Sequence, residues 1–330
     1  MNHKTSAENQ GDSPFVSVVI PSYNSSIYIS QCLEAIRAQQ TRYTYEVIMV
    51  DSSSDRTEQI VARDFPEVRL VHLDRQTCTG MARNIGVEYA RGEIVLFIDT
   101  DCIAPPGWIE KMCNAIQSSA TRGICGSLEN GTPWSITGSV GYYLEFFRFL
   151  PSRGKPYETF FLVGGNSGFK KTVFDKVRFL DANIGDDVAF SQELKTQGSK
   201  LMFFPDIPVR HLNKSGLRRM LNYQHKLGLG ACRYRRVLSP GIMKVLQKLP
   251  LLTFLLPNAI MIWIAAVVLH KRGIAEFLKF LLLLPVSYLA NMNWALGFYR
   301  ELRQQNLNTG KQSAGTDVRE EIPAGRKREH

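Results

Sequence analysis

Short apolar runs alternate with amphipathic segments through the first hundred residues. In the amphipathic segments apolar side chains recur at helical spacing, as at Ile29, Leu33 and Ile36, and a second helix is predicted over 80–90. The apolar runs are rich in β-branched residues and predict strands over 15–21, 45–50, 68–73 and 93–98. Strands that alternate with helices predict an α/β domain, with a mostly parallel sheet and right-handed crossovers.

The pattern changes after residue 101. Pro105-Pro106-Gly107-Trp108 opens another helix, and an aromatic stretch follows over 134–149. A glycine-rich turn at Gly164-Gly165-Asn166 comes next, before a helix that carries Gly185-Asp186-Asp187. We interpret this half as the acceptor side of the same domain, which then spans 15–212.

Two long apolar segments, 249–269 and 277–298, predict membrane-associated helices within a region spanning 249–299. Each can span roughly 30 Å as a helix. The short connection between them predicts a hairpin with both ends on one side, and the neighbouring basic residues place that side in the cytoplasm. Lys271 and Arg272 in the connection oppose this rule, so an interfacial or re-entrant hairpin stays open, as do two buried helices of a soluble domain.

The charge pattern favours a membrane surface over nucleic acid. The net charge is +10, yet residues 207–275 hold 12 Lys and Arg with no Asp or Glu, so the remaining 28 basic residues face 30 acidic ones. Basic residues directly before an apolar segment suit anionic lipid headgroups, so we expect basic amphipathic helices beside the membrane over 213–248. The polar ends, 1–14 and 300–330, are expected to be disordered.

The cysteines indicate no metal site. Cys32, Cys78, Cys102, Cys113, Cys125 and Cys232 form no CxxC pair. We expect buried thiols in a reducing compartment.

Asp99-Thr100-Asp101 follows the apolar strand predicted over 93–98. Open α/β sheets bind ligands at the edge where such strands end. Two carboxylates so close together suit a hard divalent cation that is shared with substrate phosphates. The alternative is an ordinary turn or helix cap.

In this order, five motifs resemble the inverting family 2 glycosyltransferases of the GT-A fold, and the resemblance covers about residues 16–211. The resemblance implies a Rossmann-like α/β domain with a mostly parallel central sheet, here followed by a C-terminal helical membrane hairpin. The motifs are 17–24 (SVVIPSYN), 50–55 (VDSSSD), 82–86 (ARNIG), 99–101 (DTD) and 185–187 (GDD).

The resemblance implies a donor site for a nucleotide-diphosphate sugar. Asp51 would accept the imide proton of a uracil ring, and Pro21 and Tyr23 would hold base and ribose. Arg83 would offer a planar cation to the diphosphate, although an ion pair with a neighbouring acid is the alternative. Asp99 would contact the ribose or a metal-bound water.

The same resemblance implies a metal and a catalytic base. Asp101, with Asp99 and a late histidine, His211, would hold Mg²⁺ or Mn²⁺, although His211 could equally be a surface residue. Asp187, with Asp186 beside it, would remove the proton of the acceptor hydroxyl; acids that merely complement a helix N-terminus are the alternative. The family usually has Glu-Asp here, so Asp186 is a shortened form. The acceptor or sugar would contact the turn Gly164-Gly165-Asn166.

These features predict a membrane-attached, metal-dependent, inverting glycosyltransferase. It would use a UDP-sugar most simply, and a lipid-linked or membrane-proximal saccharide at the cytoplasmic face of the inner membrane. Transfer to a polyprenyl phosphate is a related alternative. A sugar nucleotidyltransferase and a non-catalytic membrane scaffold are more distant ones. The segment 217–225 lacks the Gln-x-x-Arg-Trp motif of processive synthases, which favours transfer of one sugar at a time.

Overall fold

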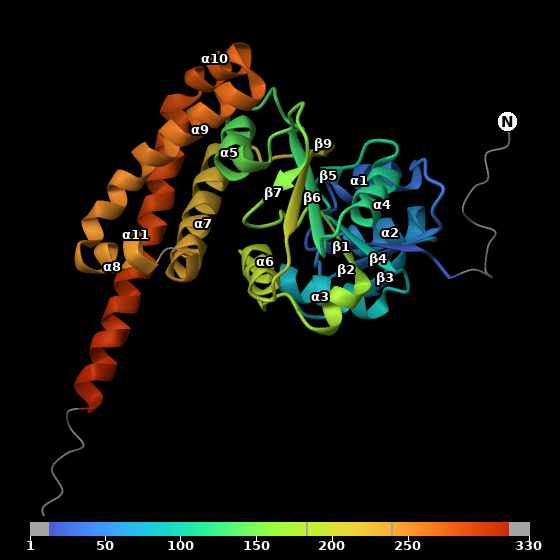
Figure 1. Ribbon diagram of the computed structural model, residues 1–330, viewed down its shortest axis with the longest axis horizontal. Helices are drawn as coiled ribbons and strands as arrows, with labels where there is room; N and C mark the ends of the chain where they lie inside the picture. The colour runs from blue at the N-terminus through green and yellow to red at the C-terminus, as the bar shows by residue number, and fades with distance from the viewer. Residues whose placement is uncertain (1–12, 183, 239, 317–330) are drawn as a thin grey trace, which may run out of the picture.

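A computed structural model describes residues 13–182, 184–238 and 240–316 (Figure 1). It contains a nine-stranded sheet in the order β3-β2-β1-β4-β8-β6-β9-β5, with β7 paired to β9. The strands are β1 (Val16–Ser22), β2 (Tyr45–Asp51), β3 (Arg69–His72), β4 (Ile94–Ile98), β5 (Cys102–Ile103), β6 (Gly123–Asn130), β7 (Tyr157–Glu158), β8 (Asn166–Lys170) and β9 (Leu201–His211).

The prediction of a mostly parallel sheet is confirmed. Strands β3, β2, β1 and β4 are parallel neighbours. β8 runs against both β4 and β6, so β6 and its parallel neighbour β9 point the same way as the first four. β5 and β7 run against β9. The carboxyl ends of β1, β2 and β4 therefore lie at one edge, where the predicted donor motifs follow the strands.

The helices of the α/β domain pack against this sheet through apolar faces. They are α1 (Ile29–Arg37), α2 (Thr57–Asp64), α3 (Thr79–Tyr89), α4 (Trp108–Ser118) and α6 (Asp186–Thr196). The central strands are buried on both faces, and Phe97 on β4 packs against Phe169, Phe174 and Phe179. All six cysteines are buried, and within the described residues none forms a disulfide.

The other helices gather beside the α/β domain, on the left in Figure 1. They are α5 (Ile136–Phe146), α7 (Leu217–Leu238), α8 (Pro240–Lys248), α9 (Leu256–Arg272), α10 (Ile274–Leu282) and α11 (Leu284–Thr316), with the short 3₁₀ turns η1 (Phe147–Phe149) and η3 (Pro250–Leu255). The third 3₁₀ turn, η2 (Lys171–Asp175), follows β8 and packs in the core of the α/β domain.

Glycine residues allow α7 and α11 to cross closely. A Cβ on Gly228 would lie 2.0 Å from the Trp294 carbonyl oxygen, and one on Gly297 would lie 2.1 Å from that of His225. The Asn293 side chain donates to the Leu221 carbonyl over 2.8 Å. The basic helix α7 is thereby fixed to the apolar C-terminal helices.

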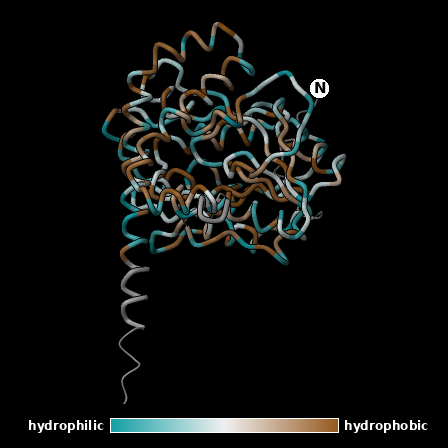
Figure 2. Tube along the Cα trace, turned by 60° about the vertical axis from the view of Figure 1, so that its left-hand side comes forward, coloured by the Kyte–Doolittle hydropathy of each residue, from teal (hydrophilic) through white to brown (hydrophobic). Residues whose placement is uncertain are grey.

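One segment, Pro250–Arg272, is long and apolar enough to cross a membrane, with a mean hydropathy of 2.2. Only 28% of its apolar window is buried, so most of it does not serve as a core helix. Figure 2 shows brown, apolar stretches at the top of the trace, where Figure 1 places α9 and α10.

The second predicted segment, 277–298, is bent: α10 and α11 meet at Leu283 with a bend of 69°. Taken together the two helices are also long and apolar enough to cross a membrane, as one broken span or as a re-entrant pair. Pro285 lies in the first turn of α11, where its missing N–H costs nothing, whereas inside a continuous helix it would remove a hydrogen bond. The prediction of disorder from residue 300 is wrong as far as Thr316, because α11 continues to that residue. The predicted disorder over 1–12 and 317–330 falls outside the described residues.

Candidate active site

A cleft of about 670 Å³ lies at the carboxyl edge of the sheet. It is lined by ten of the twelve residues predicted to form the site: Pro21, Tyr23, Arg83, Asp99, Asp101, Gly164, Gly165, Asp186, Asp187 and His211. Asp51 and Asn166 do not line it. The structure therefore brings together residues from opposite ends of the domain, and it separates two residues from the rest.

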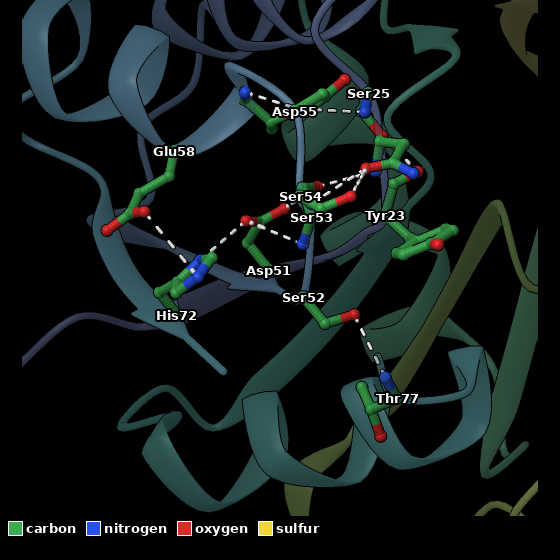
Figure 3. Close-up of polar contacts among 12 residues, drawn as sticks. Tyr23, Ser25, Asp51, Ser52, Ser53, Ser54, Asp55, Glu58, His72 and Thr77 are labelled. Carbon is green, nitrogen blue, oxygen red and sulfur yellow. Dashed lines mark hydrogen bonds and ion pairs between the residues drawn. The ribbon is translucent and has the colours of Figure 1, made fainter. Parts of the chain in front are cut away.

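Asp51 is fully buried at the end of β2. Its Oδ1 accepts a hydrogen bond from Ser53 Oγ at 2.5 Å, and its Oδ2 lies 2.9 Å from His72 Nδ1 (Figure 3). The β2–β3 register places Asp51 directly opposite His72. The carboxylate thus orders the loop after β2 and the end of β3, and its contact with a nucleobase stays a prediction.

His72 is a candidate residue of the nucleobase site that the sequence analysis did not predict. Figure 3 shows it between Asp51 and Glu58, and its Nε2 lies 3.7 Å from Glu58 Oε2. No motif surrounds His72, and only the pairing of β3 with β2 reveals its position. Tyr23 points away from this network in Figure 3, and 45% of its surface is exposed.

Arg83 on α3 is held by two carboxylates. Its Nη1 donates to Asp186 Oδ2 at 2.6 Å, and its Nη2 donates to Asp99 Oδ1 at 2.9 Å. The guanidinium is almost fully buried, and the Coulomb attraction of Asp186 and Asp99 outweighs its desolvation, so its pKa is raised. Arg83 therefore forms ion pairs with neighbouring acids, the alternative to a contact with the diphosphate. Through these pairs it links the end of β4 to the start of α6.

Gly164 and Gly165 allow this cluster to form. A Cβ on Gly164 would lie 2.4 Å from Arg83 Nη2, and one on Gly165 would lie 2.7 Å from Asp99 Oδ2. The turn is tight as predicted, but the groups that approach its backbone closely are protein side chains. The predicted contact of these two glycines with acceptor or sugar stays a prediction.

The prediction that the Asn166 side chain contacts the acceptor or sugar is corrected, because this side chain lies in the core. It is completely buried at the start of β8. Its amide donates to the carbonyls of Ser127 and Ile207, and its oxygen accepts from Trp108 Nε1, each at 2.9 Å. With these contacts made, the side chain joins β6, β9 and α4, and it has no surface to offer an acceptor.

Asp186 and Asp187 begin α6 directly after Gly185, whose φ of 76° favours glycine. Asp187 Oδ2 accepts a hydrogen bond from the Gly164 backbone N–H at 3.3 Å. Burial, together with the neighbouring negative charge of Asp186, raises the pKa of Asp187 to about 7. Burial also raises the pKa of Asp186, against the opposing effect of Arg83. The pair therefore combines one carboxylate tied to arginine with one suited to exchange a proton near neutral pH.

Asp101 and His211 form the candidate metal site. β5 pairs with the end of β9, so His211 Nε2 lies 3.5 Å from Asp101 Oδ1. Cys102 Sγ lies in the same cluster, but burial raises the pKa of this thiol, which disfavours the thiolate that metals bind. An oxygen and an imidazole nitrogen facing the cleft fit Mg²⁺ or Mn²⁺. Asp99, predicted as a third ligand, is paired with Arg83 instead.

Asn213 fixes the orientation of His211. Its amide nitrogen lies within hydrogen-bond distance of three oxygen acceptors: Asn130 Oδ1 at 2.9 Å, Thr132 Oγ1 at 3.1 Å and the His211 carbonyl at 3.1 Å. Its side-chain oxygen therefore faces His211 Nδ1, at 2.8 Å. His211 must then donate from Nδ1, which leaves a lone pair on Nε2, the nitrogen that faces Asp101. No sequence motif marks Asn213.

We expect Asn213→Ala to lower the affinity for Mn²⁺ by about 10- to 100-fold, because His211 loses the partner that selects its tautomer. Mn²⁺ titration followed by calorimetry measures this change. Asn222→Ala, at an exposed position on α7, is the matched control and should leave the affinity unchanged. Equal Mn²⁺ affinities in the wild type, Asn213→Ala and Asn222→Ala would contradict the role assigned to Asn213.

Known proteins of one family resemble this chain. The profile described as Glycosyl transferase family 2 matches residues 17–178. Glycosyltransferase AglE of Haloferax volcanii is 33% identical over 134 residues, which cover 39% of this chain and 44% of AglE. The match thus spans less than half of AglE. The succinoglycan biosynthesis protein ExoO of Rhizobium meliloti is 27% identical over 286 residues, 81% of this chain and 80% of ExoO.

A solved structure agrees in fold over nearly the whole chain. The mannosyltransferase PcManGT from Pyrobaculum calidifontis, solved in complex with GDP-Man and Mn²⁺, superposes with a TM-score of 0.56 at 19% identity. The match covers 90% of this chain and 88% of that one. Sequence and fold agree that residues 17–178 form a glycosyltransferase family 2 domain in the GT-A fold.

Proposed function

We propose that this glycosyltransferase moves one sugar from a nucleotide-diphosphate sugar to an acceptor hydroxyl with inversion, and that Asp187 is the base. The observation that carries the proposal is the Asp187 carboxylate, which is buried, tied to the Gly164 N–H and raised in pKa to about 7. It lines the same cleft as Asp101 and His211. A base with this pKa removes a hydroxyl proton efficiently near neutral pH.

The reaction is a single displacement at the anomeric carbon. The acceptor oxygen bonds to that carbon, and its proton passes to Asp187. The bond from the carbon to the diphosphate oxygen breaks, and the electron pair stays on the diphosphate. Asp186 holds Arg83 and thereby positions α6, so that Asp187 keeps its place beside the turn at Gly164.

The donor side consists of the residues at the carboxyl edge of the sheet. Pro21 and Tyr23 contact base and ribose, Asp51 orders the loop that receives the base, and Asp99 and Arg83 face the ribose and diphosphate. Asp101 and His211 would hold Mg²⁺ or Mn²⁺, which would supply positive charge to the diphosphate leaving group. PcManGT, which holds GDP-Man with Mn²⁺, supports a metal-assisted donor site, so both UDP- and GDP-sugars are candidates.

The acceptor is a saccharide linked to a membrane lipid, reached from the cytoplasmic face of the inner membrane. The apolar segment Pro250–Arg272 and the basic helix α7 support membrane attachment beside the cleft. A polyprenyl phosphate is the second candidate acceptor, because the cations Arg148 and Lys214 also line the cleft. A phosphate oxygen needs no strong base, so the effect of removing Asp187 separates the two candidates.

The first test is the thermal stability of the detergent-solubilised full chain against UDP, GDP and other nucleotides, with and without Mn²⁺. A ligand of the native state raises the unfolding midpoint by mass action. We expect UDP to stabilise the protein only with Mn²⁺. Stabilisation by GDP instead would move the donor to a GDP-sugar and keep the enzyme class. No response to any nucleotide would overturn the proposed donor site.

A further inference from the structure

The cleft continues past the acidic residues and between the C-terminal helices. Its additional lining residues come from α5, α7, α9 and α11, and we call this part the helix arm. Its members that the argument uses are Glu145 on α5, Gln224, Leu227 and Ala231 on α7, Ile260 on α9 and Trp294 on α11. The arm is continuous with the proposed catalytic site.

One face of α7 forms a wall of the arm. Met220, Gln224, Leu227 and Ala231 recur at spacings of three and four residues, so they share a side of the helix. Arg218, Arg219 and Lys226 line a different pocket. The helix thus turns a mostly apolar face to the cleft, interrupted by Gln224, and carries basic residues elsewhere, as expected beside anionic headgroups.

The arm lies among the apolar helices. Ile260 belongs to the segment that is long enough to cross a membrane, and Trp294 belongs to the bent pair α10–α11. On the same α9 helix, Ile262 does not line the arm and is 72% exposed. A catalytic cleft that leads between such helices gives a hydrocarbon chain a path from the bilayer to the site.

A polar pair lies where the arm meets the catalytic site. Gln224 Nε2 donates to Glu145 Oε1 at 3.1 Å, and Gln224 is almost fully buried. Among the described residues, none donates a hydrogen bond to the other oxygen, Glu145 Oε2. Lys214, stacked on the Tyr223 ring at 4.2 Å, is a cation beside this pair. A free carboxylate oxygen suits a sugar hydroxyl, and a cation suits a diphosphate.

We propose that the helix arm binds the acceptor as a saccharide linked through a diphosphate to a long hydrocarbon chain. The chain lies between α7, α9 and α11, and Glu145 accepts a hydrogen bond from a hydroxyl of the first sugar. This inference rests on the proposed function and names the acceptor's binding site. We assign a single ligand to the whole arm, because the apolar wall, the cation and the carboxylate all line one cleft.

The test uses a polyprenyl diphosphate that carries a benzophenone at its far end, incorporated with the full chain into phospholipid nanodiscs. Photolabelled peptides are mapped by mass spectrometry. We expect labelling of peptides that contain Leu227, Ile260 or Trp294, and at least a tenfold loss of it in Ala231→Phe, which fills the arm. Ile262→Phe, on the exposed face of α9, is the matched control and should label like the wild type. Labelling confined to exposed faces, or equal in both variants, overturns the proposal.

Each preparation is also tested for nucleotide-dependent stabilisation. A protein that responds to a nucleotide with Mn²⁺ but is not labelled in the arm leaves the proposed function standing and refutes this inference. A wild-type protein that responds to no nucleotide refutes the proposed function itself. If Ala231→Phe alters the stabilisation by nucleotide, a second variant, Ile260→Trp, is compared with the wild type in its place. This variant narrows the arm from the side of α9.

The role of Glu145 has a separate test with two probes, one bare and one bearing a single sugar on the diphosphate. Glu145→Gln keeps the shape but removes the charge that strengthens a hydrogen bond, so binding is compared at pH 8, above the pKa of about 7 to which burial raises Glu145. We expect about tenfold weaker binding of the sugar-bearing probe and no change for the bare one. Equal effects on both probes, or none on either, would refute the contact between Glu145 and the sugar.

Discussion

Asp187→Asn is expected to lower the rate of sugar transfer by about three orders of magnitude while leaving nucleotide affinity unchanged. A positioned general base contributes typically 10²- to 10⁴-fold, and asparagine keeps the size of the side chain but cannot accept the proton. Wild-type kcat/KM should rise with pH and level off above about 7, because the base works only when deprotonated and the pKa of Asp187 is about 7. Initial rates over pH 5.5–9 and nucleotide-dependent thermal shifts measure both effects.

The same substitution should change the pH dependence of stability. The pKa of Asp187 is raised on folding, so between about pH 4 and 7 the native state holds a proton that the unfolded chain has lost. The contribution of Asp187 to the free energy of unfolding therefore falls as pH rises through this range. Asp187→Asn removes this pH-dependent loss of stability. The difference in Tm, variant minus wild type, should therefore be more positive at pH 8 than at pH 5.

Asp175→Asn is the matched control, since Asp175 is exposed on η2 and should change neither rate nor Tm. Near-full activity of Asp187→Asn would favour a polyprenyl phosphate as acceptor, because its oxygen needs no strong base. Loss of both transfer and nucleotide binding would mean that Asp187 is a structural acid. Asp186→Asn offers a contrast: it leaves the buried Arg83 with one partner fewer and should destabilise the fold itself.

Local patterns were sufficient to predict the strands and the order of the motifs. The first strand, predicted over 15–21, is Val16–Ser22, and the second, predicted over 45–50, is Tyr45–Asp51. A buried parallel strand needs a continuous apolar run, and that signal is contained in a few neighbouring residues. The match of residues 17–178 to glycosyltransferase family 2 favours a glycosyltransferase over the nucleotidyltransferase alternative.

Contacts between distant strands could not be predicted in the same way. His211 reaches Asp101 only because β5 pairs with β9, and Asn213 then selects the histidine tautomer. His72 lies against Asp51 through the β2–β3 register. Register depends on the packing of whole strands, so a single residue such as Asn213 or His72 carries no local sign of its role.

The glycine pair illustrates a limit of a different kind. Gly164-Gly165 correctly predicted a close approach of backbone to another group, but the approaching groups are Arg83 and Asp99. Asn166, read as part of the same turn, is buried because β8 begins there and its amide satisfies three core groups. Composition indicates that a turn is crowded, whereas only the tertiary structure identifies its neighbours.

Asp101→Ala is expected to abolish measurable transfer, a loss of at least three orders of magnitude, and to remove the effect of Mn²⁺ on nucleotide binding. Asp101 is the carboxylate that faces His211 Nε2 in the candidate metal site. A bound cation contributes several kcal/mol of charge stabilisation, and each 1.36 kcal/mol corresponds to tenfold in rate. Without Mn²⁺, wild type and variant should bind the nucleotide equally weakly.

Calorimetric titration of the nucleotide with and without Mn²⁺ separates this effect from a general loss of structure. Asp206→Ala, which removes an exposed acid from the same strand as His211, should behave like the wild type in both conditions. If Asp101→Ala still binds the nucleotide more tightly with Mn²⁺, the metal lies elsewhere, and Asp99 released from Arg83 becomes the leading ligand. If the variant loses metal-free binding too, Asp101 acts on the structure of the β5–β9 pair, where Leu212 donates to its carbonyl at 2.7 Å, and the metal assignment fails.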